Sequence, residues 1–178
     1  TYHEWLNSQF NDDQPCQSRH MPKVNDPVLI ADNIQNLQPR TPYNRHKFAG
    51  GNVTVLKMIQ QNLAQLGITV PSERFDSTIA ATNYLLKEQT LDMTMHTDSV
   101  TTDTLYISVS LINKAGHKFP SGYPARRAYV QIAAVDGTDT VFQSGMLRPD
   151  YELSGIDPQY EPHYNVITDS SQVQIYEM

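Results

Sequence analysis

Cysteine is almost missing from this chain, since Cys16 is the only one among 178 residues. One thiol cannot form an internal disulfide, so no disulfide framework supports the fold. A structural zinc site built on Cys16, His20 and two remote histidines stays open. Such sites ordinarily show two close pairs of ligands, however, and the sequence holds one.

Long apolar runs and clustered basic residues are also missing. No stretch of 18 apolar residues exists, so the sequence predicts no transmembrane segment. The 13 Lys and Arg are scattered and outnumbered by 19 Asp and Glu, which leaves a net charge of -6. Because nucleic-acid binding depends on clustered cations that displace counterions from phosphates, we expect no nucleic-acid partner.

The common hydrolytic motifs are absent too. The sequence has no G-x-S-x-G, no H-E-x-x-H and no glycine-rich phosphate loop. A cysteine hydrolase built on Cys16 stays open, because folding alone could bring a base to the thiol, but nothing in the spacing favours it.

The first half of the chain alternates between helical and irregular segments. Residues 1–10 carry aromatic and aliphatic side chains at helical spacing and predict a short amphipathic helix. Residues 11–52 hold five prolines and many Asn, Asp and Gln, which predicts a long loop wrapped around something, and a flat cofactor would supply the missing core. Apolar stripes at 55–66 and 72–88 then predict a helical hairpin, with Gly67 ending its first helix.

Beyond residue 90 the hydrophobic period changes to two, which is typical of half-buried strands. Strands are predicted at 91–97, 104–113, 128–134, 140–144 and 172–177. They imply a small antiparallel β-sandwich that is incomplete at its C-terminus, because the chain stops within a predicted strand. With Thr1 at the start instead of Met, we expect a processed chain or a piece of a longer one. The expected class is α+β, with a helical and loop region at 1–90 and a sandwich region at 91–178 that can pack as one domain.

The stretch PCQSRHMP at 15–22 carries the most distinctive chemistry. Covalent haem attachment uses C-x-x-C-H, in which two thiols form thioethers to the porphyrin and the adjoining histidine is an axial ligand of the iron. Cys16 and His20 occupy the positions of the first cysteine and the histidine, whereas Arg19 stands where the second cysteine would be. The motif alone therefore leaves a free thiol near a surface histidine as the alternative.

Three other stretches offer further cofactor-binding candidates. In RHKFAGGN, His46 precedes two glycines that let the backbone approach a flat ligand closely. In AGHKFPSGYPARRA, His117 lies in a proline-rich connection between strands, and Arg126 follows it. Alternation sends Arg126 and Arg127 to opposite faces, so at most one meets a carboxylate such as a haem propionate. In YEPHYN, His163 is flanked by tyrosines. Each has a structural or surface role as its alternative.

The chain resembles a family of bacterial multihaem c-type cytochromes in five stretches that keep the same order. They are YHEWLNSQF, PCQSRHMP, RHKFAGGN, AGHKFPSGYPARRAYV with VFQSGML, and YEPHYNVITDSSQVQIYE. The resemblance implies that Cys16 is a thioether anchor and His20 the proximal iron ligand. It also implies that His46 and His117 are axial ligands to this or neighbouring haems. Arg19 departs from the family pattern, which leaves open single-thioether attachment, non-covalent haem or a lost haem site.

This resemblance implies an electron-transfer domain with haem c and two histidines on the iron, and no substrate chemistry of its own. It implies export to the periplasm or the extracellular space, because c-type haem is attached outside the cytoplasm. The expected partners are redox proteins or further haem domains, selected through the acidic surface by charge complementarity. Two alternatives stay open: a haem-free β-sandwich binding or scaffold module derived from such a cytochrome, and a component of a multihaem reductase.

Overall fold

The computed structural model describes residues 1–122, 126–154 and 163–177. It divides the chain into two compact units, one of Tyr2–His117 and one of Thr1 with Lys118–Met178. The change of hydrophobic period led us to expect a division at residue 90. The observed division lies later, because the first two long strands remain with the helices that precede them.

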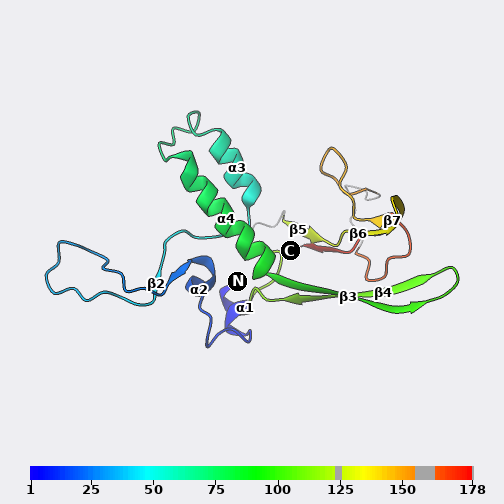
Figure 1. The fold of residues 1–178 in the computed structure, drawn as a ribbon, viewed down its shortest axis with the longest axis horizontal. Helices are drawn as coiled ribbons and strands as arrows, with labels where there is room; N and C mark the ends of the chain where they lie inside the picture. The colour runs from blue at the N-terminus through cyan, green and yellow to red at the C-terminus, as the bar shows by residue number, and fades with distance from the viewer. Residues whose placement is uncertain (123–125, 155–162, 178) are drawn as a thin grey trace. The chain divides into compact units, whose positions relative to one another are not determined.

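The helices lie in the first unit (Figure 1). They are α1 (Tyr2–Leu6), α2 (Cys16–His20), α3 (Val53–Gln61) and α4 (Ser72–Glu88). The short helix α1 lies within the predicted segment 1–10, and α4 has the bounds that its apolar stripe predicts, with Thr82 and Leu85 buried. Helices α3 and α4 contact each other, so the predicted helical hairpin is confirmed.

Helix α3 shows both what the apolar stripe captures and where it overshoots. The Asn52 side chain caps its start by accepting a hydrogen bond from the Val55 backbone N–H at 2.8 Å. The helix ends at Gln61, although the stripe continues to residue 66. Further turns follow, and Ile68 N–H donates back to the Leu63 carbonyl oxygen at 2.8 Å. Gly67 has a φ of +66°, so its predicted left-handed conformation is confirmed.

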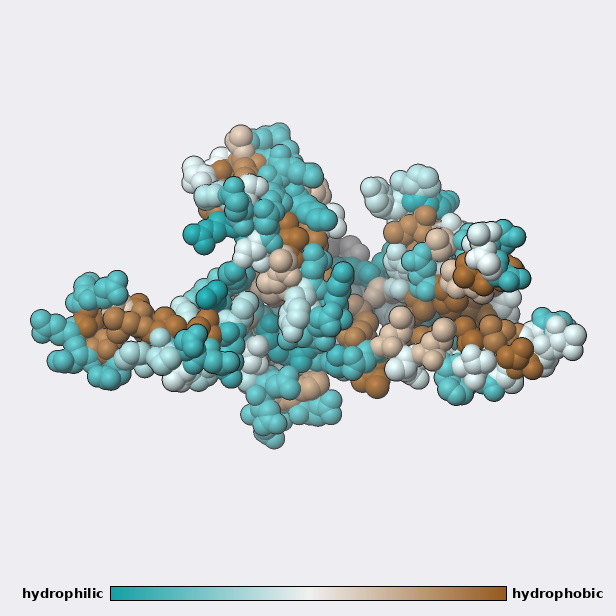
Figure 2. Space-filling model, in the orientation of Figure 1, coloured by the Kyte–Doolittle hydropathy of each residue, from teal (hydrophilic) through white to brown (hydrophobic). Residues whose placement is uncertain are grey.

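The predicted long loop contains short ordered pieces besides α2. Strands β1 (Lys23–Val24) and β2 (Tyr43–Asn44) pair antiparallel, and an isolated bridge joins Val28 to Arg40. Figure 2 shows apolar atoms on the surface of the loop that extends from this ladder. Among its apolar side chains, Leu29 and Ile34 are about half exposed, at 48% and 56%. This loop therefore has little core of its own.

A long two-stranded ladder follows directly from α4. Strand β3 (Leu91–Val100) pairs antiparallel with β4 (Leu105–Asn113). Met93 and Met95 lie opposite Leu111 and Val109. Because paired residues share a face, these four side chains form one apolar face of the ladder. The predicted strands at 91–97 and 104–113 are confirmed, and the first continues to Val100. The expected half-burial is wrong for β3, because every residue after Leu91 in that strand is exposed.

The second unit is built from two further antiparallel ladders. Strand β5 (Arg127–Tyr129) pairs with β8 (Ile175–Glu177), and β6 (Ile132–Asp136) pairs with β7 (Asp139–Ser144). Its buried apolar core consists of Leu153, Val173 and Ile175, against which Tyr129 packs. The predicted run at 128–134 is divided between β5 and β6. At this break Gly145 approaches so closely that an added Cβ would lie 2.5 Å from the Val130 carbonyl oxygen.

The fold is α+β, as expected, and all the described strand pairs are antiparallel. The strands that we expected to form a β-sandwich pair instead as separate two-stranded ladders, in the part of the chain that the structure describes. Within these ranges, no helix is long and apolar enough to cross a lipid bilayer.

Candidate functional site

Helix α2 carries the residues of the haem-attachment motif. Cys16 begins the helix and His20 ends it, so the thiol and the imidazole lie about one turn apart on the same face. The Met21 backbone N–H donates to the Gln17 carbonyl oxygen at 2.9 Å and closes this turn. Cys16 is exposed and forms no disulfide, so a reactant can reach its thiol. This single turn therefore places the thiol and the imidazole close together.

The His20 ring is held in one orientation by the backbone of Ala49. Its Nδ1 lies 2.8 Å from the Ala49 carbonyl oxygen. Because a carbonyl oxygen only accepts, Nδ1 carries the proton and donates it, which leaves the lone pair of a neutral ring on Nε2. The Ala49 backbone N–H donates in return to the His20 carbonyl oxygen at 2.8 Å, and Ala49 is buried. Histidines that ligate metals ordinarily have their other nitrogen fixed by such a partner.

A second histidine, His117, lies next to His20. The two ring centres are 6.3 Å apart and the ring planes are nearly parallel, at 13°. This separation exceeds the about 3.5–4.0 Å of direct carbon contact, so the rings do not touch face to face. Two metal–nitrogen bonds of about 2 Å each, together with the about 1 Å from nitrogen to ring centre on either side, give about 6 Å. Two imidazoles on one metal ion thus have a similar distance between their ring centres.

The His117 segment is attached to the end of the β3–β4 ladder. Asn113 ends β4, and its Nδ2 donates to the His117 carbonyl oxygen at 2.8 Å. Its Oδ1 accepts from the Ala115 backbone N–H at 2.8 Å. One side chain thus closes the short turn before His117, which is half-buried. His20 and His117 belong to the same unit although 97 positions separate them in the sequence.

His46 occupies different surroundings in the first unit. Its side chain is exposed, and its ring lies 6.4 Å from Tyr43 and 5.9 Å from Phe48 between ring centres. The ring contacts of the described residues thus place His46 with aromatic side chains, and they pair His20 with His117. A role for His46 as a ligand to a neighbouring haem stays a prediction. The contribution of RHKFAGGN to the pair comes from Ala49 instead.

The remaining candidates lie in the second unit and bind its backbone. His163 Nδ1 donates to the Ile175 carbonyl oxygen at 2.6 Å, and its Nε2 lies 3.4 Å from Glu177 Oε1. Arg126 Nη1 donates to the Ser121 carbonyl oxygen at 2.9 Å. Their cofactor roles stay predictions. Parts of the sequence motifs around them, at 123–125 and 155–162, lie outside the described residues.

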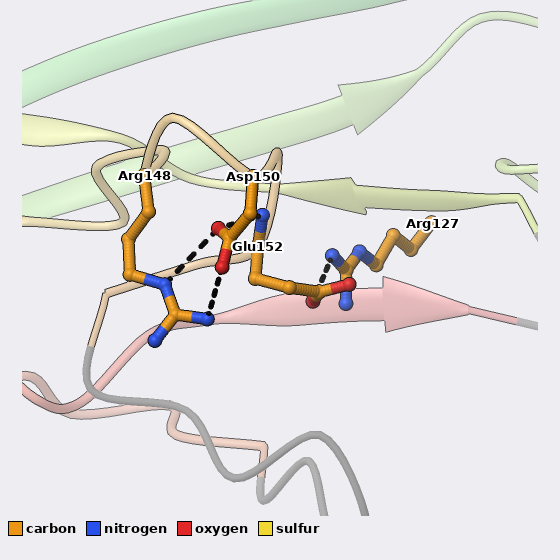
Figure 3. A network of polar contacts seen from close by, with 4 residues as sticks. All are labelled: Arg127, Arg148, Asp150 and Glu152. Atoms are coloured by element: carbon orange, nitrogen blue, oxygen red, sulfur yellow. Dashed lines mark hydrogen bonds and ion pairs between the residues drawn. The ribbon is translucent and has the colours of Figure 1, made fainter.

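Arg127 meets a carboxylate of the described residues (Figure 3). Its Nη2 lies 3.0 Å from Glu152 Oε2. In the turn beside this pair, Arg148 donates to both oxygens of Asp150, at 3.2 and 2.8 Å. The Glu152 backbone N–H donates to the same carboxylate and, with Arg148, lowers the pKa of Asp150. Both arginines thus donate to carboxylates of the same unit, and these contacts stabilise the fold of the second unit.

A smaller polar cluster lies on β3 and β4. Asp98 accepts from Ser108 Oγ at 2.5 Å and from His96 Nδ1 at 3.1 Å. These hydrogen bonds, that from Ser108 first, lower the pKa of the Asp98 carboxyl. Ser108 and His96 both contact the carboxylate, so the cluster is not a nucleophilic Ser–His–Asp chain.

We expect the Asp98 carboxyl to titrate below the ordinary range of aspartate, and Ser108→Ala to bring its pKa back toward that range. Because the folded-state pKa is depressed, the stabilising contribution is present above the unfolded-state pKa and is lost as the pH falls through the folded one. NMR titration of the Asp98 side-chain carboxyl carbon in both proteins measures this. Identical midpoints in the two proteins would contradict the assigned cause.

No group of three or more His, Cys, Asp or Glu side chains within the described ranges is arranged to hold a metal ion. A haem iron needs only two protein ligands, because the porphyrin supplies the other four nitrogens. The chain matches no protein family model, no curated protein and no solved structure. The pairing of His20 with His117 therefore carries the functional assignment.

Sequence reasoning missed the residue that orients His20. The signal was present in RHKFAGGN, where small residues allow a close backbone approach. That signal was assigned to His46 because imidazole is the obvious ligand chemistry. The carbonyl oxygen of Ala49, three positions later, makes the contact.

Proposed function

We propose that this chain is an electron-transfer domain of a multihaem c-type cytochrome, with His20 and His117 as the axial ligands of one haem iron. The observation that carries the proposal is the near-parallel pair of imidazole rings with centres 6.3 Å apart. Two histidines fill both axial positions, which leaves no open site for a substrate and favours electron transfer over catalysis. The haem, when bound, supplies a one-electron couple.

The residues around the pair have defined tasks in this function. Ala49 holds the proton of His20 on Nδ1, so that Nε2 is the ligating nitrogen. Cys16 is exposed one turn before His20, at the position of the first thioether anchor. Cys16 would hold the haem covalently, through a thioether to one of its vinyl groups.

The packing of the first unit supports a bound porphyrin. Its buried apolar side chains are Met21, Ala49 and Leu85, and the first two flank His20 in sequence or in space. Other large apolar residues of this unit are exposed, such as Phe48 at 64% and Met58 at 58%. Because a unit of this length ordinarily buries more apolar surface, a large flat ligand would supply the missing core.

The cellular setting belongs to the same proposal. Covalent attachment through Cys16 implies maturation outside the cytoplasm, hence a periplasmic or extracellular location. With a net charge of -6, the chain would select basic surfaces on redox partner proteins or on further haem domains.

An absorption spectrum of the full chain, produced in a bacterial host with cytochrome c maturation, tests the proposal. We expect a Soret band and a sharp α band on reduction, and a pyridine haemochrome with the α band of one saturated and one intact vinyl group. Cys16→Ala should leave haem that extracts into acidified solvent. A colourless wild-type protein would favour the haem-free scaffold module instead. A spectrum that shifts with small added ligands would indicate an open axial site, as in a reductase component.

A further inference from the structure

Arg19 stands where the haem-attachment motif has its second cysteine, and its side chain makes three contacts within the first unit. The Nη1 atom donates to Gln14 Oε1 at 3.1 Å, and Nη2 donates to the Gln89 carbonyl oxygen. The guanidinium carbon lies 5.5 Å from the ring centre of Phe10, at the distance of a cation–π contact. Gln89 caps the end of α4, so Arg19 ties α2 to the C-terminus of that helix.

The segment that carries His117 is tied to the same place. The Lys114 backbone N–H donates to the Thr90 carbonyl oxygen at 2.9 Å. The Lys114 side chain donates to the Glu88 carbonyl oxygen at 3.1 Å. Residues 88–90 thus form a platform to which two segments are hydrogen-bonded. Arg19 binds α2 to it, and Lys114 binds the His117 segment to it. The two histidines are held relative to each other through this platform.

Phe10 provides a second connection between the two sides. Its ring lies under the Arg19 guanidinium and against Gly116, the residue before His117. A Cβ on Gly116 would lie 3.2 Å from Phe10 Cδ2. The φ of Gly116 is +73°, a backbone conformation that residues with a Cβ rarely adopt. Glycine therefore lets the backbone beside His117 approach the ring on which Arg19 stacks.

We infer that Arg19 is a positioning residue for the axial pair: by binding the platform at 88–90 it fixes α2, and thereby His20, relative to His117. This inference rests on the proposed function for the role of the two histidines. Arg19 fixes α2 from the protein side, whereas a second thioether would fix it from the porphyrin side. The chain thus keeps a single covalent attachment, through Cys16, without releasing α2.

The test compares the full chain carrying Arg19→Ala, Arg19→Cys or the control Arg74→Ala. Arg74 is an exposed arginine on α4, and its hydrogen bonds to other described residues are formed by its backbone N–H and carbonyl oxygen. The first measurement uses protein made without cytochrome c maturation, so it is independent of haem. Hydrogen exchange at the Ala49 amide, which donates to His20, should accelerate about tenfold in Arg19→Ala and in Arg19→Cys, since both lose charged hydrogen bonds. Exchange at wild-type rates in both variants, as in Arg74→Ala, would overturn the inference.

The second measurement is the electron paramagnetic resonance spectrum of the oxidised, matured protein. Near-parallel imidazole planes give a rhombic low-spin signal, whereas crossed planes give a strongly anisotropic one. We expect the rhombic signal in wild type and Arg74→Ala, and a shift toward the anisotropic form in Arg19→Ala. Arg19→Cys, which gains a second thioether, should recover the rhombic signal while its haem-free exchange stays fast. An unchanged signal in Arg19→Ala would overturn the positioning role. A wild-type protein without haem would overturn the proposed function, and the hydrogen-exchange result alone would then decide whether Arg19 fixes α2.

Discussion

Under the proposed function, replacement of His117 with alanine is expected to turn a six-coordinate, low-spin haem site into one with an open axial position. The imidazole ring that lies 6.3 Å from His20 is removed, and no carbon side chain replaces its ligating nitrogen. Covalent attachment should survive, because Cys16 and His20 remain on α2. The Soret and α bands should therefore lose their low-spin form completely, while the haem content per chain stays close to that of wild type. Added imidazole should restore the low-spin spectrum by filling the open position.

A matched control for this result is His96→Ala. His96 is also a histidine of the first unit, but it is exposed on β3 and bound to Asp98. Its replacement should leave the haem spectrum unchanged. His46→Ala decides the remaining ligand prediction. If His46→Ala opens the axial position and His117→Ala does not, the pairing of His20 with His117 is not the iron site.

The matching replacement of His20 should have a broader effect than that of His117. His20→Ala removes the proposed axial ligand. It also removes the hydrogen-bond donor to the carbonyl oxygen of Ala49, which is a buried residue. A buried acceptor left without its donor costs about 1–3 kcal/mol. The two replacements differ because His20 also holds the backbone of a second motif, at Ala49, besides its proposed role as an iron ligand.

Local patterns in the sequence were sufficient for much of the fold. The stripe at 72–88 matches α4, and alternation from residue 91 to residue 113 matches the β3–β4 ladder. Both patterns are repeated many times within one segment, so single exceptions do not alter them. The stripe at 55–66 overshot, because the turns after Gln61 keep apolar residues at similar spacing while their backbone hydrogen bonds alternate between the α-helical type and shorter or longer turns. The change of period at residue 90 lies inside the first unit, because β3 follows α4 directly and pairs there with β4.

The candidate site was predictable as a set of residues and not as an arrangement. Haem-motif chemistry identified Cys16 and His20, and a proline-rich loop identified His117. Nothing in the spacing of His46 and His117 shows which of them faces His20, because both are far from it along the chain. The partners of Arg19 were equally inaccessible, since Gln89 contributes a backbone oxygen, which any residue at that position provides.

Replacement of Leu153 with alanine is expected to have the largest effect on the stability of the second unit. Leu153 is fully buried, and it shares its apolar core with Val173 and Ile175. Truncation of a buried leucine to alanine lowers the free energy of unfolding by about 2–5 kcal/mol, because less apolar surface is buried on folding and a cavity remains. A small core has few neighbours that can relax into the cavity, so the loss should lie in the upper part of that range.

Hydrogen exchange at the Val130 amide measures this loss, because that amide donates to the Gln174 carbonyl oxygen next to the core strand. Its protection should fall by the free energy that Leu153→Ala removes, as denaturant unfolding of the same protein should confirm. Leu147→Ala is the matched control, since Leu147 bridges Leu153 through its backbone but is 49% exposed. Equal losses in the two variants would mean that burial of Leu153 does not hold this unit together. A loss confined to Leu153→Ala would show that the burial of Leu153 stabilises these strands.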